Sequence, residues 1–214
     1  ARSRAPAWSA LWAARATGRA FVTTYHGAYA EKSTPKRFYN GVMARGDLVI
    51  ANSGYTRDLI MGRYGTPSAK IRVVHRGVDG ALFDPDAIAG DRVARLRAAW
   101  GLTGGERIVL QAARLTAWKG QGVVVAAARH LKEMGRPLQA VIVLAGDDQG
   151  REGYATGLRQ AIMEGGLEGQ VRLVGHVDDM PAAFKAAHLS IVASIEPEAF
   201  GRTAVESQAL GCPV

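Results

Sequence analysis

Cysteine is almost absent from this sequence, which holds Cys212 alone among 214 residues. A single thiol excludes a disulfide framework, and no group of cysteine and histidine has the spacing of a zinc finger. We therefore expect a reducing compartment, and the cytoplasm is the first choice. Long hydrophobic runs are also missing. The longest aliphatic run, residues 123–128, is far shorter than the roughly 18 residues that a membrane-spanning helix needs.

Acidic residues are scarce in the first part of the chain. Residues 1–85 contain 13 Lys and Arg against 5 Asp and Glu, whereas residues 86–214 contain 14 of each. The whole net charge of +8 therefore lies in the first part. This asymmetry favours an anionic partner there, namely nucleic acid, acidic lipid headgroups or a phosphorylated acceptor. A general arginine bias is the alternative, because 21 of the 27 basic residues are arginine.

Hydrophobic residues make up 48% of the chain, which is enough for a core and excludes a disordered protein. The length fits one large domain or two small ones. The chain begins with alanine, and residues 210–214 resemble a helix end that leads into a further strand. We therefore expect an internal fragment of a longer protein.

Short β-branched runs alternate with helical segments and lack strict polar alternation, which predicts parallel strands buried on both faces. Such alternation is typical of βαβ units and of a doubly wound α/β sheet. A segment rich in Gly, Asp and Pro, residues 77–85, interrupts it and predicts a boundary between domains 1–85 and 86–214. The expected strands are 20–25, 47–52, 71–75, 107–113, 139–145, 171–174 and 189–194.

Four helices are expected from periodicity and from capping residues. Residues 1–18 predict an amphipathic surface helix, and residues 55–64 follow the capping pair Asn52 and Ser53. Residues 35–45 predict a helix with Pro35 in its first turn, and residues 121–134 predict a helix that Gly135 ends.

Ligands of open α/β sheets bind beyond the carboxyl ends of the strands, so the residues that follow each strand are candidates for a site. They are His26, Ser53, Arg114, Gly146, Gly175 and Glu196. After the last strand, Glu198 and Glu206 flank seven residues that contain a glycine turn and a helix start. Backbone N–H groups near Phe200 and Gly201 would then favour a phosphate. The alternative is that both glutamates are solvated.

A second candidate is the loop that follows the strand 107–113. It carries Arg114 and Lys119 and closes with Gly120. A planar guanidinium group together with a point charge suits a diphosphate. Two basic residues that merely keep a loop in solvent are the alternative.

The two glutamates and the cation loop together resemble retaining glycosyltransferases of family 4, which use nucleotide sugars and have the GT-B fold. Four further runs resemble the family over nearly the whole chain: 24–27 its N-terminal histidine turn, 51–56 its "Asn-Ser" segment, 75–79 its domain exit, and 175–177 its base-contacting turn. The resemblance implies an α/β protein with two Rossmann-like, doubly wound parallel-sheet domains. Both would be incomplete in this chain.

The resemblance also implies a role for each matching residue. Arg114 and Lys119 would hold the diphosphate, Glu206 the ribose and Glu198 the hexose. The amides near Phe200 and Gly201 would bind the sugar and the distal phosphate, Val177 and Asp179 would lie at the base, and His26 would contact the donor sugar. We expect His26, Glu198, Arg114 and Lys119 to serve catalysis, with no protein nucleophile. No metal or other cofactor is expected, because the two cations neutralise the diphosphate.

Two aspartates beside the base-contacting turn have two interpretations. Asp178 and Asp179 follow the turn 175–177, where a carboxylate can accept the paired N–H donors of guanine, which favours a GDP-sugar over a UDP-sugar. Capping of a helix that begins near Met180 is the alternative. The family pattern often has Gly and Asp where this chain has Ala113 and His188, so we expect local packing at these two positions to differ from that of the family.

Two other classes compete with a transferase. A Rossmann oxidoreductase or a non-catalytic nucleotide binder would have Gly-x-Gly-x-x-Gly directly after a strand, and this sequence has no such run. The sequence also has no recognisable nucleic-acid-binding motif.

The expected partners are a nucleotide sugar, a glycan or lipid-linked acceptor of cell-envelope or lipopolysaccharide synthesis, and an anionic membrane surface. For the last, Phe38 with Val42 and Tyr39 with Met43 would form an apolar stripe, which would place a cytoplasmic enzyme on the inner face of the membrane. Packing of that stripe on the sheet is the alternative.

Overall fold

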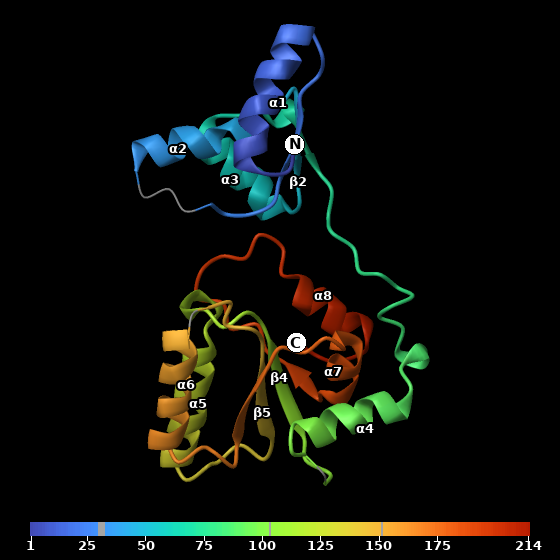
Figure 1. Ribbon diagram of the computed structural model, residues 1–214, viewed down its shortest axis with the longest axis vertical. Helices are drawn as coiled ribbons and strands as arrows, with labels where there is room; N and C mark the ends of the chain where they lie inside the picture. Colours follow the sequence, from blue (N-terminus) through green and yellow to red (C-terminus); the bar gives the residue numbers. More distant parts are fainter. Residues whose placement is uncertain (30–32, 103, 151) are drawn as a thin grey trace. The chain divides into compact units, whose positions relative to one another are not determined.

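The computed structural model describes residues 1–29, 33–102, 104–150 and 152–214 (Figure 1). It forms two compact units, of which unit 1 comprises Ala1–Gly77 with Pro197–Phe200 and unit 2 comprises Val78–Glu196 with Gly201–Val214. The chain passes from unit 1 to unit 2 after Gly77, where the Gly-, Asp- and Pro-rich segment 77–85 begins. Each unit has its own parallel sheet and its own core.

Unit 1 contains a three-stranded parallel sheet in the order β1-β2-β3. Val22 lies opposite Leu48, and Val49 lies opposite Ile71. The strands are β1 (Val22–Tyr25), β2 (Leu48–Ala51) and β3 (Ile71–Val73), and the helical segments are α1 (Arg4–Thr17), α2 (Thr34–Asn40), η1 (Gly41–Ala44), α3 (Gly54–Tyr64) and η2 (Ser68–Lys70).

The core of unit 1 lies on one face of its sheet. Tyr25 and Val49 are fully buried against Leu11 of α1, Met43 of η1 and Ile60 of α3. The other face stays more open in the described part of the chain, where Val22 is 40% exposed. The prediction of strands buried on both faces is therefore wrong for unit 1, because the helices that pack on this sheet share a single core with one face only.

The expected helix 35–45 is also shorter in the structure. The α-helix ends at Asn40 and tightens into the 3₁₀ turn η1. This change of pitch turns Val42 and Met43 into the core, where both are 0% exposed, whereas Phe38 and Tyr39 are 60% and 41% exposed. The predicted outward stripe of these four residues is therefore wrong for Val42 and Met43.

Unit 2 contains a four-stranded parallel sheet in the order β6-β5-β4-β7. Leu110 lies opposite Val143 on one side and opposite Ser190 on the other. The strands are β4 (Ile108–Ala112), β5 (Val141–Ala145), β6 (Val171–Gly175) and β7 (Leu189–Ser190). The helical segments are η3 (Pro85–Ala87), α4 (Gly90–Ala99), η4 (Ala117–Lys119), α5 (Gln121–Glu133), α6 (Glu152–Glu164), α7 (Met180–Ala186) and α8 (Arg202–Ala209).

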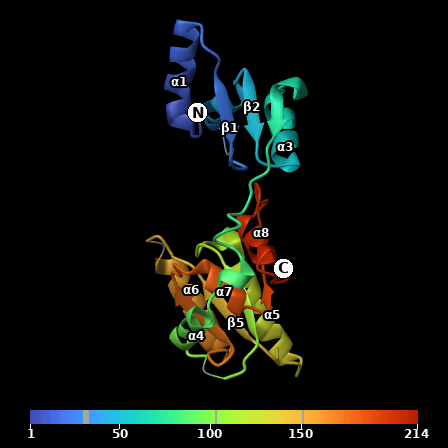
Figure 2. The same cartoon turned by 90° about the vertical axis from the view of Figure 1, so that its right-hand side faces the viewer.

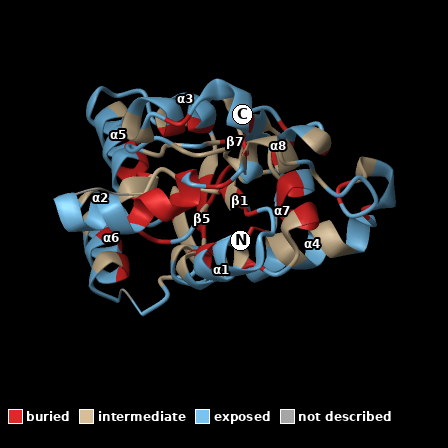
Figure 3. Ribbon diagram, turned by 90° about the horizontal axis from the view of Figure 1, so that it is seen from above, coloured by how far each residue is buried: buried red, intermediate tan, exposed pale blue. Residues whose placement is uncertain are grey.

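Helices cover both faces of the unit 2 sheet (Figures 1 and 2). Val109 and Leu144 pack against α5 and α6, whereas Leu110 and Val143 pack against α7, which is buried over most of its length (Figure 3). Every residue of β4 is buried, which confirms the predicted double burial for this strand. No helix in the described residues is long and apolar enough to cross a membrane.

The strand order of unit 2 reverses beside β4. Strands β5 and β6 follow on one side of β4, but β7 returns to the other side. The loop after β4 and the segment after β7 therefore leave neighbouring strands at the same edge of the sheet. This edge is the topological switch point, where open α/β sheets bind their ligands.

Candidate functional site

The loop that follows β4 presents two cations at the switch point. Arg114 is exposed, and its guanidinium donates to the side-chain oxygen of Gln149 at 3.4 Å. Lys119 ends the short helix η4, and its ammonium nitrogen lies 4.3 Å from the centre of the Trp118 ring. A cation above an indole face is held electrostatically by the ring. The predicted cation loop is thus an ordered element with both charges at the carboxyl end of β4.

Two glycines let this loop pack directly on neighbouring backbone. Gly120 has φ +74°, and a Cβ atom there would lie 1.9 Å from the carbonyl oxygen of Ala193. A Cβ atom on Gly146 would lie 1.9 Å from the carbonyl oxygen of Ala113. No other residue type fits such approaches. These contacts fix the two ends of the loop against the segments that follow β7 and β5.

The helix α8 begins after β7 with a left-handed glycine. Gly201 has φ +80° and precedes Arg202, the first residue of the helix. The N–H groups and the positive dipole end of such a first turn favour a phosphate group. Glu206 is one turn further, is only 15% exposed, and lies with Oε1 3.4 Å from Nε of Arg202. It is therefore not the fully solvated carboxylate of the alternative interpretation.

The cation loop and α8 meet at a small cavity of unit 2. Lys119 from the loop and Thr203 from the first turn of α8 line it, together with Gln111 and the segment that follows β7. Unit 2 thus brings Arg114, Lys119, Gly201 and Glu206 to one edge of the sheet. His26, Glu198 and Phe200 belong to unit 1.

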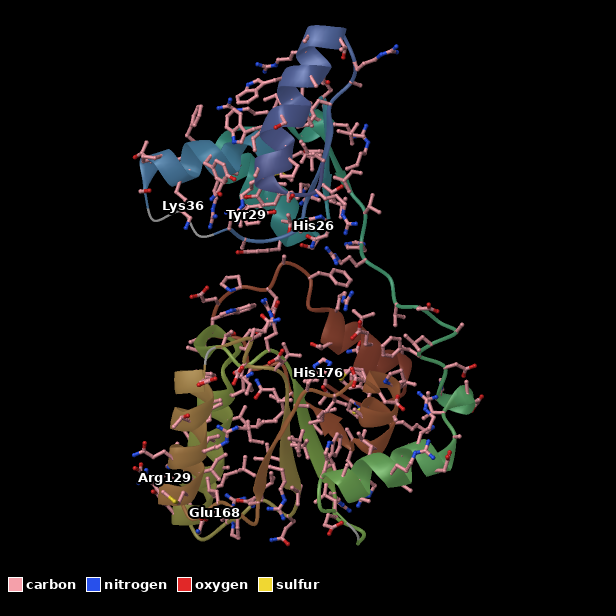
Figure 4. All side chains as sticks on the ribbon, in the orientation of Figure 1. His26, Tyr29, Lys36, Arg129, Glu168 and His176 are labelled. Carbon is pink, nitrogen blue, oxygen red and sulfur yellow. The ribbon has the colours of Figure 1, made fainter. Side chains whose placement is uncertain are left out.

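His26 follows β1 in unit 1 and is labelled in Figure 4. Its Nδ1 lies 2.8 Å from the guanidinium of Arg76, and Nε of Arg2 donates to its Nε2 at 3.4 Å. Burial, followed by the positive charges of Arg76 and Arg2, lowers the pKa of His26. The imidazole is therefore neutral at pH 7. The side-chain amide of Asn52 donates to the His26 carbonyl at 3.2 Å and fixes the turn.

The turn that follows β6 packs partly into the core of unit 2. Val177 is a core residue, only 9% exposed. Asp179 caps α7 by accepting the Ala182 N–H at 3.1 Å, and it accepts two hydrogen bonds from Arg92 at 2.7 and 2.9 Å. The bonds from Arg92 lower the pKa of Asp179. The capping alternative is confirmed for Asp179, whereas the Asp178 side chain is 98% exposed.

Four residues around the site were not found from the sequence. Gln111 and Gln121 bond the backbone of the cation loop, Trp118 stacks on Lys119, and Arg92 holds Asp179. Gln111 had a usable signal, because it is a polar residue inside an otherwise apolar buried strand. Arg92 had none, because its partner Asp179 lies 87 residues away in sequence.

Two acidic residues beside the site accept hydrogen bonds from nearby backbone N–H groups. Asp147 accepts the Gln149 N–H at 2.9 Å, and Asp148 accepts the Gly150 N–H at 3.0 Å. In the described part of the chain, no group of three or more His, Cys, Asp or Glu side chains is arranged to hold a metal ion.

Family models match both parts of the chain. The model described as Glycosyltransferase Family 4 matches residues 1–81, and the model described as Glycosyl transferases group 1 matches residues 93–214. The chain belongs to the glycosyl transferases group 1 family. A curated relative, the D-inositol 3-phosphate glycosyltransferase of Mycobacterium tuberculosis strain H37Rv, is 35% identical over 176 residues. That match covers 81% of this chain and 34% of the relative, so the chain spans about a third of the length of such relatives.

Solved structures of glycosyltransferases share the fold. A glycosyltransferase from Rickettsia africae ESF-5 is 32% identical, with a TM-score of 0.85, and covers 99% of this chain and 55% of its own. Anabaena Alr3699/HepE in complex with UDP-glucose is 27% identical, with a TM-score of 0.84 and coverage of 99% and 57%. WaaG, at 16% identity and a TM-score of 0.71, shares the fold alone. The α/β fold of this chain is therefore of the GT-B class, as the resemblance implied.

Proposed function

We propose that this group 1 glycosyl transferase chain belongs to a retaining enzyme that moves a hexose from a UDP-sugar to a glycan or lipid-linked acceptor. The observation that carries the proposal is the pairing of the cation loop with the N-terminus of α8 at the switch point of unit 2. Two cations and a helix N-terminus on neighbouring strand ends suit a diphosphate. Synthesis of cell-envelope polysaccharide or lipopolysaccharide is the proposed setting.

Each residue has a proposed role in this reaction. Arg114 and Lys119 hold the diphosphate and neutralise the charge that develops on the departing nucleotide. The amides near Phe200 and Gly201 bind the distal phosphate and the sugar. Glu206 accepts hydrogen bonds from the ribose hydroxyls, and its 15% exposure fits a partly covered carboxylate. No metal is needed, because the two cations supply the positive charge.

Two residues from unit 1 also have proposed roles toward the donor. Glu198 holds the hexose, and the neutral imidazole of His26 contacts the donor sugar. The proposal assigns no protein nucleophile, since departure of the nucleotide and attack of the acceptor can share one face of the sugar.

The nucleobase is proposed to be uracil. Asp179, one of two carboxylates suited to guanine, already accepts hydrogen bonds from Arg92 and from the Ala182 N–H. The structures of Anabaena Alr3699/HepE are complexes with UDP or with UDP-glucose. The test is thermal stabilisation of the full-length protein by UDP, GDP, NAD or an oligonucleotide. Stabilisation by UDP supports the proposal, and stabilisation by NAD or the oligonucleotide alone contradicts it.

Substitution of the two glutamates is expected to separate binding from chemistry. Glu206→Ala raises the KM for the donor, because a ribose contact far from the reacting carbon contributes similarly to ground and transition states. Glu198→Ala lowers kcat, because it positions the hexose at that carbon. Glu168→Ala, on the surface of unit 2 (Figure 4), is the control and leaves both constants unchanged. Initial rates over a range of donor concentrations measure these effects, and identical phenotypes for both glutamate variants refute the division of roles.

We also propose that unit 1 binds an anionic membrane surface, which would make a cytoplasmic enzyme peripheral. Its aromatic–arginine surface consists of Trp8, Trp12, Phe38, Tyr39 and Arg45. Trp12 and Phe38 are 63% and 60% exposed, and the Arg45 guanidinium lies 4.8 Å from the centre of the Phe38 ring. Exposed aromatic rings beside cations suit a headgroup layer. Each basic residue near an anionic surface contributes about 1 kcal/mol.

Liposome co-sedimentation of the full-length protein tests this surface. We expect binding to vesicles of phosphatidylglycerol, weak binding to phosphatidylcholine, and release at high salt. The double variant Trp12→Ser and Phe38→Ser should bind less, whereas Met163→Ser, which changes an equally exposed residue of unit 2, should bind as the wild type does. Equal binding to neutral and anionic vesicles, or none to either, rules the surface out.

A further inference from the structure

Gln111 is a buried amide in the middle of an apolar strand. It lies in β4 between Leu110 and Ala112 and is only 2% exposed. Its Nε2 donates to the backbone carbonyl of Lys119 at 2.7 Å, whereas its Oε1 has no hydrogen-bond partner among the described residues. A buried acceptor without a partner costs stability, so an apolar side chain would suit this position better by stability alone.

Gln121 makes the corresponding bond at the other end of the cation loop. It is the first residue of α5 and is 0% exposed. Its Nε2 donates to the carbonyl of Arg114 at 2.9 Å, and its Oε1 accepts from the Tyr154 hydroxyl at 3.3 Å. Two buried amides thus hold the backbone of the two cationic residues.

We propose that Gln111 and Gln121 form a glutamine clamp, a pair of positioning residues that fixes the spacing of Arg114 and Lys119 before the donor binds. The inference rests on the proposed function, in which these cations hold a diphosphate. A preorganised loop loses little conformational entropy on binding, and its charges need no rearrangement when the nucleotide leaves. The stability cost of the Gln111 oxygen is then tolerated because its amide N–H holds Lys119 in place.

The clamp predicts that stability and binding change in opposite senses. Gln111→Met removes the unpartnered oxygen at similar volume, so relief of its desolvation cost offsets the lost hydrogen bond to the Lys119 carbonyl. The full-length variant should therefore melt at the same temperature as the wild type or higher, yet bind UDP about three- to tenfold more weakly. A merely structural glutamine would instead lower the melting temperature and leave the affinity of the folded protein unchanged.

Gln170→Met is the matched control for this experiment. Gln170 also donates to a backbone carbonyl, that of Leu138 at 2.6 Å, but it precedes β6 at the opposite edge of the sheet. Its replacement should leave UDP affinity within about twofold of wild type, because sites without shared partners are independent. Binding of UMP, which lacks the second phosphate, should be affected less than that of UDP in Gln111→Met.

A double-mutant cycle with Lys119→Ala links the clamp to the ammonium group. If Gln111 acts through Lys119, Gln111→Met causes no further loss of UDP affinity in the Lys119→Ala background. Unchanged UDP affinity in Gln111→Met, beside weakened binding in Lys119→Ala, overturns the clamp and leaves the proposed function standing.

If the wild type binds neither UDP nor GDP, the proposed function is contradicted. The glutamine clamp can then still be tested by a measurement that needs no ligand. Hydrogen exchange then reports directly on the loop. Faster exchange of the amides of residues 114–120 in Gln111→Met, with the rest of unit 2 unchanged, supports a clamp that holds the loop. Equal exchange in variant and wild type overturns it.

Discussion

Lys119→Ala and Arg114→Ala, each made in the full-length protein, are expected to weaken UDP binding and to slow glycosyl transfer by at least about tenfold. A charge-assisted hydrogen bond to a phosphate contributes about 1.5 to 3 kcal/mol, and about 1.4 kcal/mol corresponds to a factor of ten. Both cations lie on the ordered loop after β4, at the switch point of the sheet. Isothermal titration with UDP and initial-rate kinetics measure the two effects.

Lys185→Ala is the control for these variants. Lys185 is an exposed lysine in α7, outside the cation loop, so its loss changes the net charge equally without touching the proposed site. Its affinity for UDP should remain within about twofold of wild type, as for surface substitutions in general. Wild-type kinetics for both loop variants would refute the assignment of the loop.

Gly120→Ala is expected to destabilise unit 2 by about 2 to 6 kcal/mol. The estimate combines about 1 to 3 kcal/mol for a strained left-handed residue with about 1 to 3 kcal/mol for overpacking. The overpacking arises because the new methyl group would lie 1.9 Å from the Ala193 carbonyl oxygen. Thermal unfolding of the full-length protein measures the loss.

Gly135→Ala separates the two contributions. Gly135 has φ +70°, close to that of Gly120, but nothing lies within 4 Å of the position of its Cβ atom. Its replacement should therefore cost only the backbone strain, about 1 to 3 kcal/mol. Equal destabilisation by the two substitutions would show that the contact between the cation loop and Ala193 does not constrain the loop.

The strands could be predicted because burial and β-branched residues coincide along them. In unit 2, β4 and β5 form within the predicted ranges 107–113 and 139–145, since helices cover both faces of the sheet. The same pattern overstated the burial of the strands in unit 1, where one face of the sheet is more exposed in the described residues. Local hydrophobicity marks a strand, but it does not tell how many helices will cover it.

The parts of the candidate site that directly follow a strand or precede a helix could be predicted from the sequence. Arg114 and Lys119 follow β4, and Gly201 precedes α8, so alternation of strands and helices was enough to bring them to one edge. For Asp179 the sequence offered base binding and helix capping, and it could not show the partner Arg92, which is 87 residues away in sequence. The partners of Gln111 and Gln121 are only eight and seven residues away, but the hydrogen bonds to these carbonyl groups form only once the loop has folded.

A crystal structure of the full-length protein with UDP tests the central claim, that the cation loop and α8 form the diphosphate site. The account predicts the diphosphate within hydrogen-bonding distance of the Lys119 ammonium and the Arg114 guanidinium, with the ribose hydroxyls on the Glu206 carboxylate. UDP bound elsewhere, or bound at the switch point with its diphosphate away from both cations, would contradict it.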